Sequence, residues 1–311
     1  MEIIKDNPTF NAPREKLKEF FSRGDLFYSR DAHLCFVCGR SEETQGEHDM
    51  LSMRSMFVDH IDANNDLKII CVRAETAATE LLRQIDERGK SISTFERTIA
   101  ENVDSVLIFP ESAGSIAELG YFSAHNEVAE KTLVAILEEH QRNSFLYLGP
   151  IHVINKHSRF APLPFVLAGP NEERMRKIAE RLLGESINKR PYRERFEYSA
   201  WKDIKPRHQL VIIDEMIDII SPTTEPDLRH CIEFCFGAYD ISQIRLQLAI
   251  LVATHRITRN DDGDIYRANR DVKFFECDSK VASEELRLEW NIASDDVRSD
   301  AEISFRGSDR G

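Results

Sequence analysis

Short apolar runs alternate with longer amphipathic stretches over the first two thirds of the chain. An uninterrupted apolar run is typical of a strand that is buried on both faces. The longer stretches place apolar residues at helical spacing and contain few helix-breaking residues. This alternation predicts an α/β fold, in which helices cover both faces of a parallel sheet. The apolar runs are residues 34–38, 67–72, 105–109, 132–137 and 165–167, and the helical patterns are residues 52–63, 77–103, 115–131 and 172–183.

From residue 206 onward the pattern is mostly helical. Three amphipathic segments, residues 209–220, 227–236 and 241–255, precede two short β-rich runs that flank an Asp-Gly turn within residues 256–267. Three helices followed by a two-stranded hairpin is the layout of a winged helix. We therefore predict an α/β domain over residues 1–195, a mostly helical winged-helix domain over residues 206–290 and a polar tail over residues 291–311.

Composition and charge exclude several classes of protein. The chain has 41 basic and 54 acidic residues, a net charge of -13, which argues against indiscriminate binding to nucleic acid. No apolar stretch approaches the ~20 residues that cross a bilayer, and the first residues lack the pattern of a signal peptide. We expect a cytoplasmic protein that does not enter the membrane.

The six cysteines show no spacing that repeats as a disulfide framework would, so we expect reduced thiols. Cys35 and Cys38 form a C-x-x-C pair, which zinc and redox sites also use. The pair lies inside an apolar run and has no second ligand pair nearby, so we interpret both residues as buried strand cysteines and predict no metal site.

Candidate chemistry lies in the loops that follow the predicted strands, because ligands bind at the carboxyl ends of a parallel sheet. The first strand is followed by Gly39 and Arg40, a small residue and a cation that could meet a phosphate. The third strand leads to Gly114 and Ser115, which open a helix whose first turn carries Glu118. Such a start offers backbone N–H groups to an anion, and the carboxylate faces the same cleft.

Ser115 and Glu118 have a second interpretation. Their spacing is that of a capping box, in which Glu118 would only satisfy the first amide of the helix. Ser93 and Glu96 have the same spacing and no other distinction. Spacing alone favours capping over catalysis, and the position after a central strand narrows that difference.

Residues 100–123 and 144–150 together resemble the nucleoside 2-deoxyribosyltransferase-like effectors of bacterial retrons. The resemblance implies a Rossmann-like sheet domain joined to a C-terminal winged helix, the order predicted above. The family motif falls on Asp104, Ser112, Gly114, Ser115 and Glu118. It implies that Glu118 is the catalytic carboxylate, acting on the anomeric carbon of a ribosyl group while Asp104 and the loop bind substrate. NAD is the substrate it most strongly suggests, and it implies no cofactor.

Two further residues keep two interpretations each. Glu111 either orients a ribose hydroxyl or is a solvated loop charge, and Arg40 either contacts phosphate or lies on the surface. Gly39 belongs to the same predicted site because it allows close backbone approach.

In the predicted winged helix, Arg245, Arg256 and Arg267 would form the nucleic-acid face. Acidic residues in the wing, among them Asp262, would repel phosphate, so we favour docking to a protein or to nucleic acid held by a partner. The resemblance implies that this partner is the retron reverse transcriptase with its multicopy single-stranded DNA (msDNA) and RNA. A homo-oligomer or higher assembly stays open.

Three functions are consistent with these observations. The leading hypothesis is a retron antiphage toxin, an N-glycosidase that consumes a nucleotide such as NAD and is held inactive by the reverse transcriptase–msDNA complex. The second is a metabolic phosphoribohydrolase or deoxyribosyltransferase, which the winged helix disfavours. The third is a nucleotide-sensing transcriptional regulator, which the acidic balance disfavours.

Overall fold

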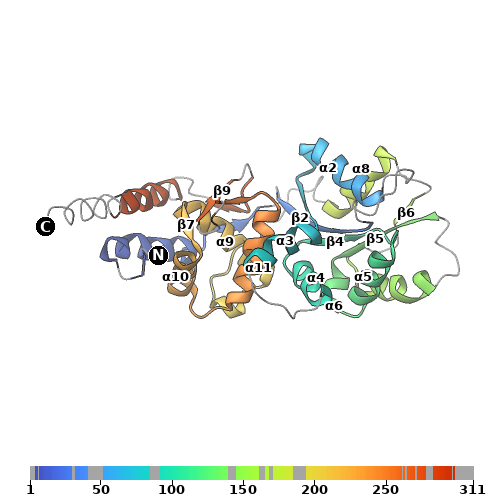
Figure 1. Ribbon diagram of the computed structural model, residues 1–311, viewed down its shortest axis with the longest axis horizontal. Helices are drawn as coiled ribbons and strands as arrows, with labels where there is room; N and C mark the ends of the chain where they lie inside the picture. Colours follow the sequence, from blue (N-terminus) through green and yellow to red (C-terminus); the bar gives the residue numbers. More distant parts are fainter. Residues whose placement is uncertain are drawn as a thin grey trace. The chain divides into compact units, whose positions relative to one another are not determined.

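The chain forms two compact units (Figure 1). One unit contains Asp31–Tyr192, and the other combines Met1–Arg30 with Arg193–Gly311. The computed structural model describes residues 4–5, 7–29, 32–40, 52–84, 92–138, 145–160, 165–167, 171–184, 194–260, 262, 265–269, 272–277, 283–295 and 297.

The first of these units, here called the sheet unit, is built on five parallel strands in the order β3-β2-β4-β5-β6. Each strand overlaps one predicted apolar run, so the α/β architecture with a parallel sheet is confirmed. Every residue of β4 is buried, as expected for a central strand covered on both faces. The strands are β2 (His33–Cys38), β3 (Ile69–Val72), β4 (Ser105–Ile108), β5 (Thr132–Leu137) and β6 (Phe165–Leu167).

Helices lie on both faces of this sheet, with α2 and α8 packed together on one face and α4, α5 and α6 on the other (Figure 1). Aromatic residues fill the space between strands and helices; Phe36 of β2, for example, contacts Phe122 of α5 with ring centroids 6.2 Å apart. The helices are α2 (Met53–Ala63), α3 (Ala74–Gln84), α4 (Ile92–Glu101), α5 (Ala113–Ser123), α6 (Asn126–Glu130), α7 (His152–His157) and α8 (Glu172–Leu183).

Two predicted helices are each divided in two. The pattern over residues 77–103 corresponds to α3 and α4, and residues 85–91 between them lie outside the described residues. The pattern over residues 115–131 corresponds to α5 and α6, because His125 adopts an extended backbone and becomes the N-cap of α6. Periodicity continues across such a break, which is why the sequence alone did not reveal it.

The second unit, here called the helical unit, contains the predicted three helices and hairpin. A third short strand, β7, joins the hairpin to give an antiparallel sheet in the order β7-β9-β8. Residues 283–295 are also helical, so helical structure continues past residue 290, the predicted end of the winged-helix domain. The named elements are α9 (Pro206–Ile220), β7 (Thr223–Thr224), α10 (Glu225–Phe236), α11 (Ile241–Ala253), β8 (Ile257–Arg259) and β9 (Ile265–Ala268).

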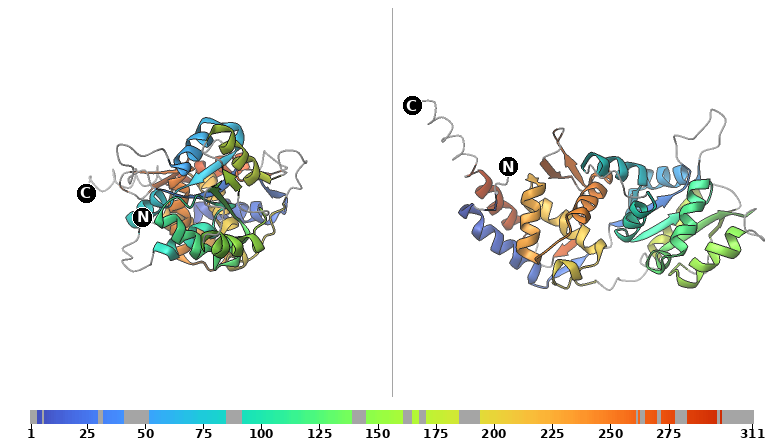
Figure 2. Two further views of the ribbon diagram at one scale, coloured as in Figure 1. Left: turned by 90° about the vertical axis from the view of Figure 1, so that its right-hand side faces the viewer. Right: turned by 60° about the horizontal axis from the view of Figure 1, so that its bottom comes forward.

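The N-terminal segment folds with the helical unit, whereas the sequence analysis grouped it with the sheet domain. Strand β1 (Leu26–Tyr28) pairs antiparallel with β10 (Phe275–Cys277), and α1 (Asn11–Ser22) lies beside the helical residues 283–295 (Figure 2). Phe10 contacts the buried Trp290, with ring centroids 5.4 Å apart. These partners are more than 240 residues apart in the sequence, so no local pattern could reveal the pairing.

Among the described residues, no helix is long and apolar enough to cross a membrane.

Candidate active site

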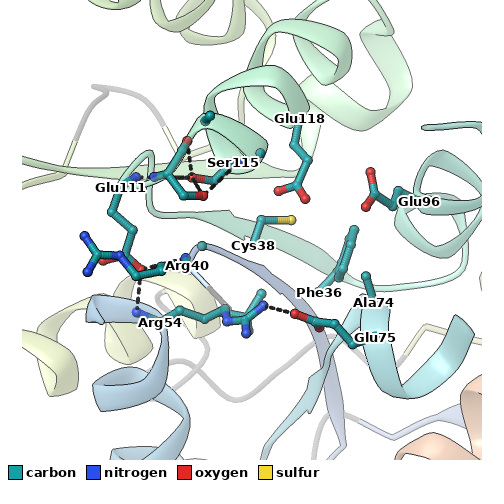
Figure 3. A pocket seen from close by; sticks show the side chains of 15 residues that line it. Phe36, Cys38, Arg40, Arg54, Ala74, Glu75, Glu96, Glu111, Ser115 and Glu118 are labelled. Carbon is teal, nitrogen blue, oxygen red and sulfur yellow. Dashed lines mark hydrogen bonds and ion pairs between the residues drawn. The ribbon is translucent and has the colours of Figure 1, made fainter. Parts of the chain in front are cut away.

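A cavity of about 650 Å³ opens at the carboxyl ends of β2 and β4 (Figure 3). The end of β2 forms one side of it, and the first turns of α2, α3 and α5 form the others, together with one side chain from α4. Because the strands are parallel, their carboxyl ends meet at one edge of the sheet, and the loops that follow them converge there.

Helix α5 begins with a capping box that is formed by two serines. Ser112 is the N-cap, and its Oγ accepts a hydrogen bond from the backbone N–H of Ser115 at 3.2 Å. In return, Ser115 Oγ accepts a hydrogen bond from the backbone N–H of Ser112 at 3.0 Å. The interpretation in which Ser115 and Glu118 form the capping box is therefore wrong. The helix start is satisfied without Glu118, whose carboxylate is available to the cavity.

Glu118 projects from α5 into the cavity (Figure 3). Its Oε2 atom is buried and has no hydrogen-bond partner among the described residues. Burial raises the pKa of Glu118, while a hydrogen bond with the Cys38 thiol and the positive charge of Arg54 oppose that rise. A buried acceptor without a partner costs free energy, so it is a candidate for a functional group that a ligand completes.

Glu96 of α4 points toward Glu118 from the neighbouring helix, and both side chains line the cavity (Figure 3). Burial and the negative charge of Glu118 together raise the pKa of Glu96 to about 7. Near neutral pH, Glu96 therefore keeps its proton for part of the time beside the Glu118 carboxylate. The sequence analysis found no distinction for Glu96 beyond its spacing from Ser93, because α4 precedes β4 and no loop-after-strand rule points to it.

An ion pair forms the opposite wall of the cavity. Arg54 lies in the first turn of α2, and its Nη1 donates to Glu75 Oε1 at 2.8 Å from the first turn of α3. The Arg54 side chain is 7% exposed, whereas the Glu75 side chain is 48% exposed. Sequence reasoning missed both residues, although Glu75 follows strand β3 and the loop-after-strand rule could have found it.

Glu111 holds the cavity wall together through the backbone. Its carboxylate accepts hydrogen bonds from the backbone N–H groups of Arg40 at 3.0 Å, Met53 at 2.8 Å and Arg54 at 3.2 Å. Neither earlier interpretation described this role. The carboxylate joins the end of β2 to the start of α2, and Gly39 provides the room, since an added Cβ there would lie 2.6 Å from the Cβ of Arg54.

The structure brings the other predicted residues together, with one exception. Gly39, Arg40, Ser112, Gly114 and Ser115 all line the cavity. The exception is Asp104, which immediately precedes β4 and binds neighbouring segments through its carboxylate and its carbonyl. Asp104 Oδ2 accepts from the Leu34 backbone N–H at 2.8 Å, and its carbonyl accepts from Arg159 at 2.6 Å. This is the amino end of the strand, opposite to the cavity, so the predicted substrate contact of Asp104 does not fit.

Cys35 and Cys38 are buried in β2, as predicted. Cys38 lines the cavity beside Glu118, and burial raises the pKa of its thiol well above the ordinary value. A neutral thiol at this place can donate a hydrogen bond to a carboxylate but is a poor nucleophile.

A family model described as STM3845 retron effector protein matches residues 50–259, which is more than half of the chain. The chain belongs to the STM3845 retron effector family. It is also 38% identical, over 68 residues, to an Escherichia coli protein provisionally named the ribosyltransferase/DNA-binding protein of retron Ec86. That match covers 21% of this chain and 22% of the Ec86 protein.

The three predicted partner-contact arginines of this retron effector differ in their surroundings. Arg256 is buried: it forms a bidentate pair with the fully buried Asp214 at 2.8 and 3.0 Å and stacks on Phe274 at 3.7 Å. Arg245 is partly exposed and donates to Glu225. Arg267 is exposed on β9. The prediction of a partner contact therefore does not fit Arg256, because its guanidinium is enclosed in the core of the helical unit.

Helix α11, the predicted recognition helix, is mostly buried. Seven of its thirteen residues are buried, and only its start and end are partly accessible. An apolar helix of this kind packs in a core and leaves few side chains to read bases. The remaining candidate surface is the hairpin, where Arg267 lies and where Asp262 is exposed, while Asp261 and Asp264 lie outside the described residues.

Proposed function

We propose that this retron effector cleaves the N-glycosidic bond of a nucleotide, with Glu118 as the catalytic carboxylate. The observation that carries the proposal is the buried, unpartnered Oε2 of Glu118, which faces a cavity of nucleotide size that Glu96 also lines. Cleavage of this bond passes through an oxocarbenium-like state, and an ionised carboxylate stabilises or traps such a state. The name of the Ec86 relative includes ribosyltransferase, which is consistent with this chemistry.

The two carboxyl groups have separate roles in this mechanism. The bond between C1′ and the base nitrogen breaks, and its electron pair leaves with the base. Glu118 stabilises the cationic sugar or bonds to C1′ as an ester, which water then hydrolyses. Glu96, with its higher pKa, gives its proton to a neutral leaving base and then accepts a proton from the attacking water.

NAD is the substrate that we propose. Glu75, Glu96 and Glu118 give the cavity an excess of negative charge, and the nicotinamide ring of NAD is cationic before the bond breaks. A cationic ring is attracted to this environment and leaves with little acid assistance. Arg40 lies on the wall away from Glu118, where its charge suits the phosphates of the same molecule.

At the level of the cell, we propose that the protein is an antiphage toxin restrained by the retron reverse transcriptase and its msDNA. Membership of a retron effector family supports this role. The element order α9, β7, α10, α11, β8, β9, with β9 central in a three-stranded antiparallel sheet, supports a winged helix as the docking module.

The test is the Glu118→Gln variant, which keeps the size of the side chain and removes its charge. Because the capping box does not include Glu118, the variant should melt close to wild type. We expect its rate of NAD hydrolysis by the purified chain to fall about 10²- to 10³-fold. Glu127→Gln, an exposed position on α6, is the matched control and should keep full activity. Comparable hydrolysis by a well-folded Glu118→Gln protein would reject the proposed site.

A further inference from the structure

We propose that Glu75, held in place by Arg54, binds the 2′- and 3′-hydroxyls of the substrate ribose, so that the cavity selects ribonucleotides over 2′-deoxyribonucleotides. The inference rests on the proposed function, since it takes the ribosyl group to lie in this cavity. It goes beyond the proposed function, which assigns no residue to the ribose hydroxyls.

The Glu75 carboxylate is held in a fixed position. Its Oε1 accepts the 2.8 Å hydrogen bond from Arg54, a side chain that is itself more than nine-tenths buried. Glu75 lines the cavity and its side chain is 48% exposed, which leaves its carboxylate room to accept further hydrogen bonds. Each carboxylate oxygen accepts up to two hydrogen bonds, so a diol can be bound without breaking the ion pair.

Glu75 and Glu118 lie on facing walls of the cavity, with Phe36 and Cys38 between them (Figure 3). Glu75, Glu96 and Glu118 line the same cavity, and the negative charge of Glu75 contributes to the raised pKa of the other two. A furanose with C1′ at Glu118 carries its 2′- and 3′-hydroxyls on the next two ring carbons, and the proposal places them toward the facing wall, where Glu75 lies.

A carboxylate is chemically suited to bind the two neighbouring hydroxyls of a ribose. Two neighbouring hydroxyls are both donors, and a carboxylate accepts without donating, so the pair is complementary. Glu75 follows β3, the strand adjacent to β2, and an acidic residue in this region of an open α/β sheet is a general means of binding ribose hydroxyls. A hydrogen bond to a charged group is strong enough to discriminate about tenfold or more.

The experiment measures binding rather than turnover, on the full chain carrying Glu118→Gln. The probes are nicotinamide mononucleotide and adenosine 5′-monophosphate, each in its ribose and 2′-deoxyribose form, with Kd measured by titration calorimetry. We expect the ribose form of at least one probe to bind about tenfold or more tightly than its 2′-deoxy form. Adding Glu75→Gln should reduce that preference to about twofold or less, whereas adding Glu127→Gln should leave it unchanged.

Glu75→Asp is the second variant, because it keeps the charge beside Arg54 and withdraws it by one methylene group. It should lose the preference even if Glu75→Gln folds poorly. Equal Kd values for the ribose and 2′-deoxy forms, or a preference that survives both Glu75 substitutions, would overturn this inference alone. Absence of binding by every probe would contradict the proposed function as well.

Discussion

At the scale of single residues, the most unusual feature is a pair of carboxyl groups that face each other in a partly buried cavity. Glu96 and Glu118 each carry a raised pKa, with burial as the largest cause for both. Two negative charges in such a place repel each other, so near neutral pH the pair tends to hold a proton. When the two carboxyl groups share one proton, one of them can act as an acid and the other as a base. Loss of that proton leaves two negative charges side by side, which lowers the stability of the folded chain.

This loss of folding stability on deprotonation leads to a prediction about Glu96. Its pKa in the folded chain, about 7, lies above the ordinary value of 4.5. A raised pKa means that the stabilising contribution is complete below the ordinary value and is lost as the pH rises through 7. Glu96→Gln, which cannot ionise, should therefore melt at a higher temperature than wild type at about pH 8 and at a similar temperature at about pH 4. Thermal melts across this range measure the difference.

The activity of the same variant tests the proton-donor role separately. Glu96→Gln should slow hydrolysis of nucleotides with a neutral base by about 10²- to 10⁴-fold. NAD hydrolysis should fall much less, because nicotinamide leaves without a proton. Equal losses with both kinds of substrate would show that Glu96 does not donate a proton to the leaving base.

These two residues also show the reach of sequence reasoning at this scale. Glu118 became a candidate because it follows a buried strand at the carboxyl edge of the sheet, and the family resemblance then favoured catalysis over capping. Its freedom from the cap could not be found, because Ser112 and Ser115 compete for the same helix start and only the backbone geometry decides between them. Glu96 and Arg54 line the cavity because α4 and α2 pack around it. The spacing of residues along the chain does not predict this packing.

At the scale of elements, the junction between β2 and α2 sets the shape of the cavity. Glu111 binds three backbone N–H groups there, and Gly39 allows the backbone to approach Arg54. The strands were predictable because parallel strands that are buried on both faces consist of consecutive apolar residues. The junction was not, because it depends on a carboxylate from a loop about 70 residues further along the chain.

Gly39→Ala tests this junction. The new Cβ would lie 2.6 Å from Arg54 Cβ and 2.8 Å from Glu111 Oε1, so the wall must shift. We expect the free energy of unfolding to fall by about 1–3 kcal/mol. Gly120→Ala on α5 is the control, because a Cβ there meets nothing within 4 Å and alanine should stabilise the helix by about 0.5–1 kcal/mol. Denaturant unfolding of both variants gives the comparison, and an unaffected Gly39→Ala protein would show that the close approach is not restrictive.

At the scale of the whole molecule, the proposed chemistry and the proposed partner binding belong to different units. The proposed active site lies in the sheet unit, and the proposed docking module lies in the helical unit, which also includes the N-terminal segment. The net charge of -13 makes unaided binding to phosphate-rich partners unfavourable. Restraint by a reverse transcriptase–msDNA complex would then depend on local basic side chains of the helical unit.

Arg256 is unsuited to testing that restraint, although the sequence pointed to it. Its charge reversal would break the buried, bidentate ion pair with Asp214 and place two negative charges together, and breaking a buried pair costs about 3–5 kcal/mol, so lost binding would only report unfolding. Arg267 is exposed on the central strand β9, where a reversal leaves the core intact.

We therefore expect Arg267→Glu to weaken co-purification with a reverse transcriptase–msDNA complex while the purified variant hydrolyses NAD at the wild-type rate. Lys202→Glu, an exposed position of the same unit with the same change of charge, is the control and should co-purify normally. Docking through this strand would be contradicted if both variants behave like wild type.

A promoter-binding regulator would behave differently, since the chain alone would bind a specific duplex with an affinity that falls steeply with salt, about tenfold or more between low and physiological ionic strength. The acidic charge of the chain and the burial of α11 make that outcome unfavourable, because few cations and few accessible side chains are left to meet the groove.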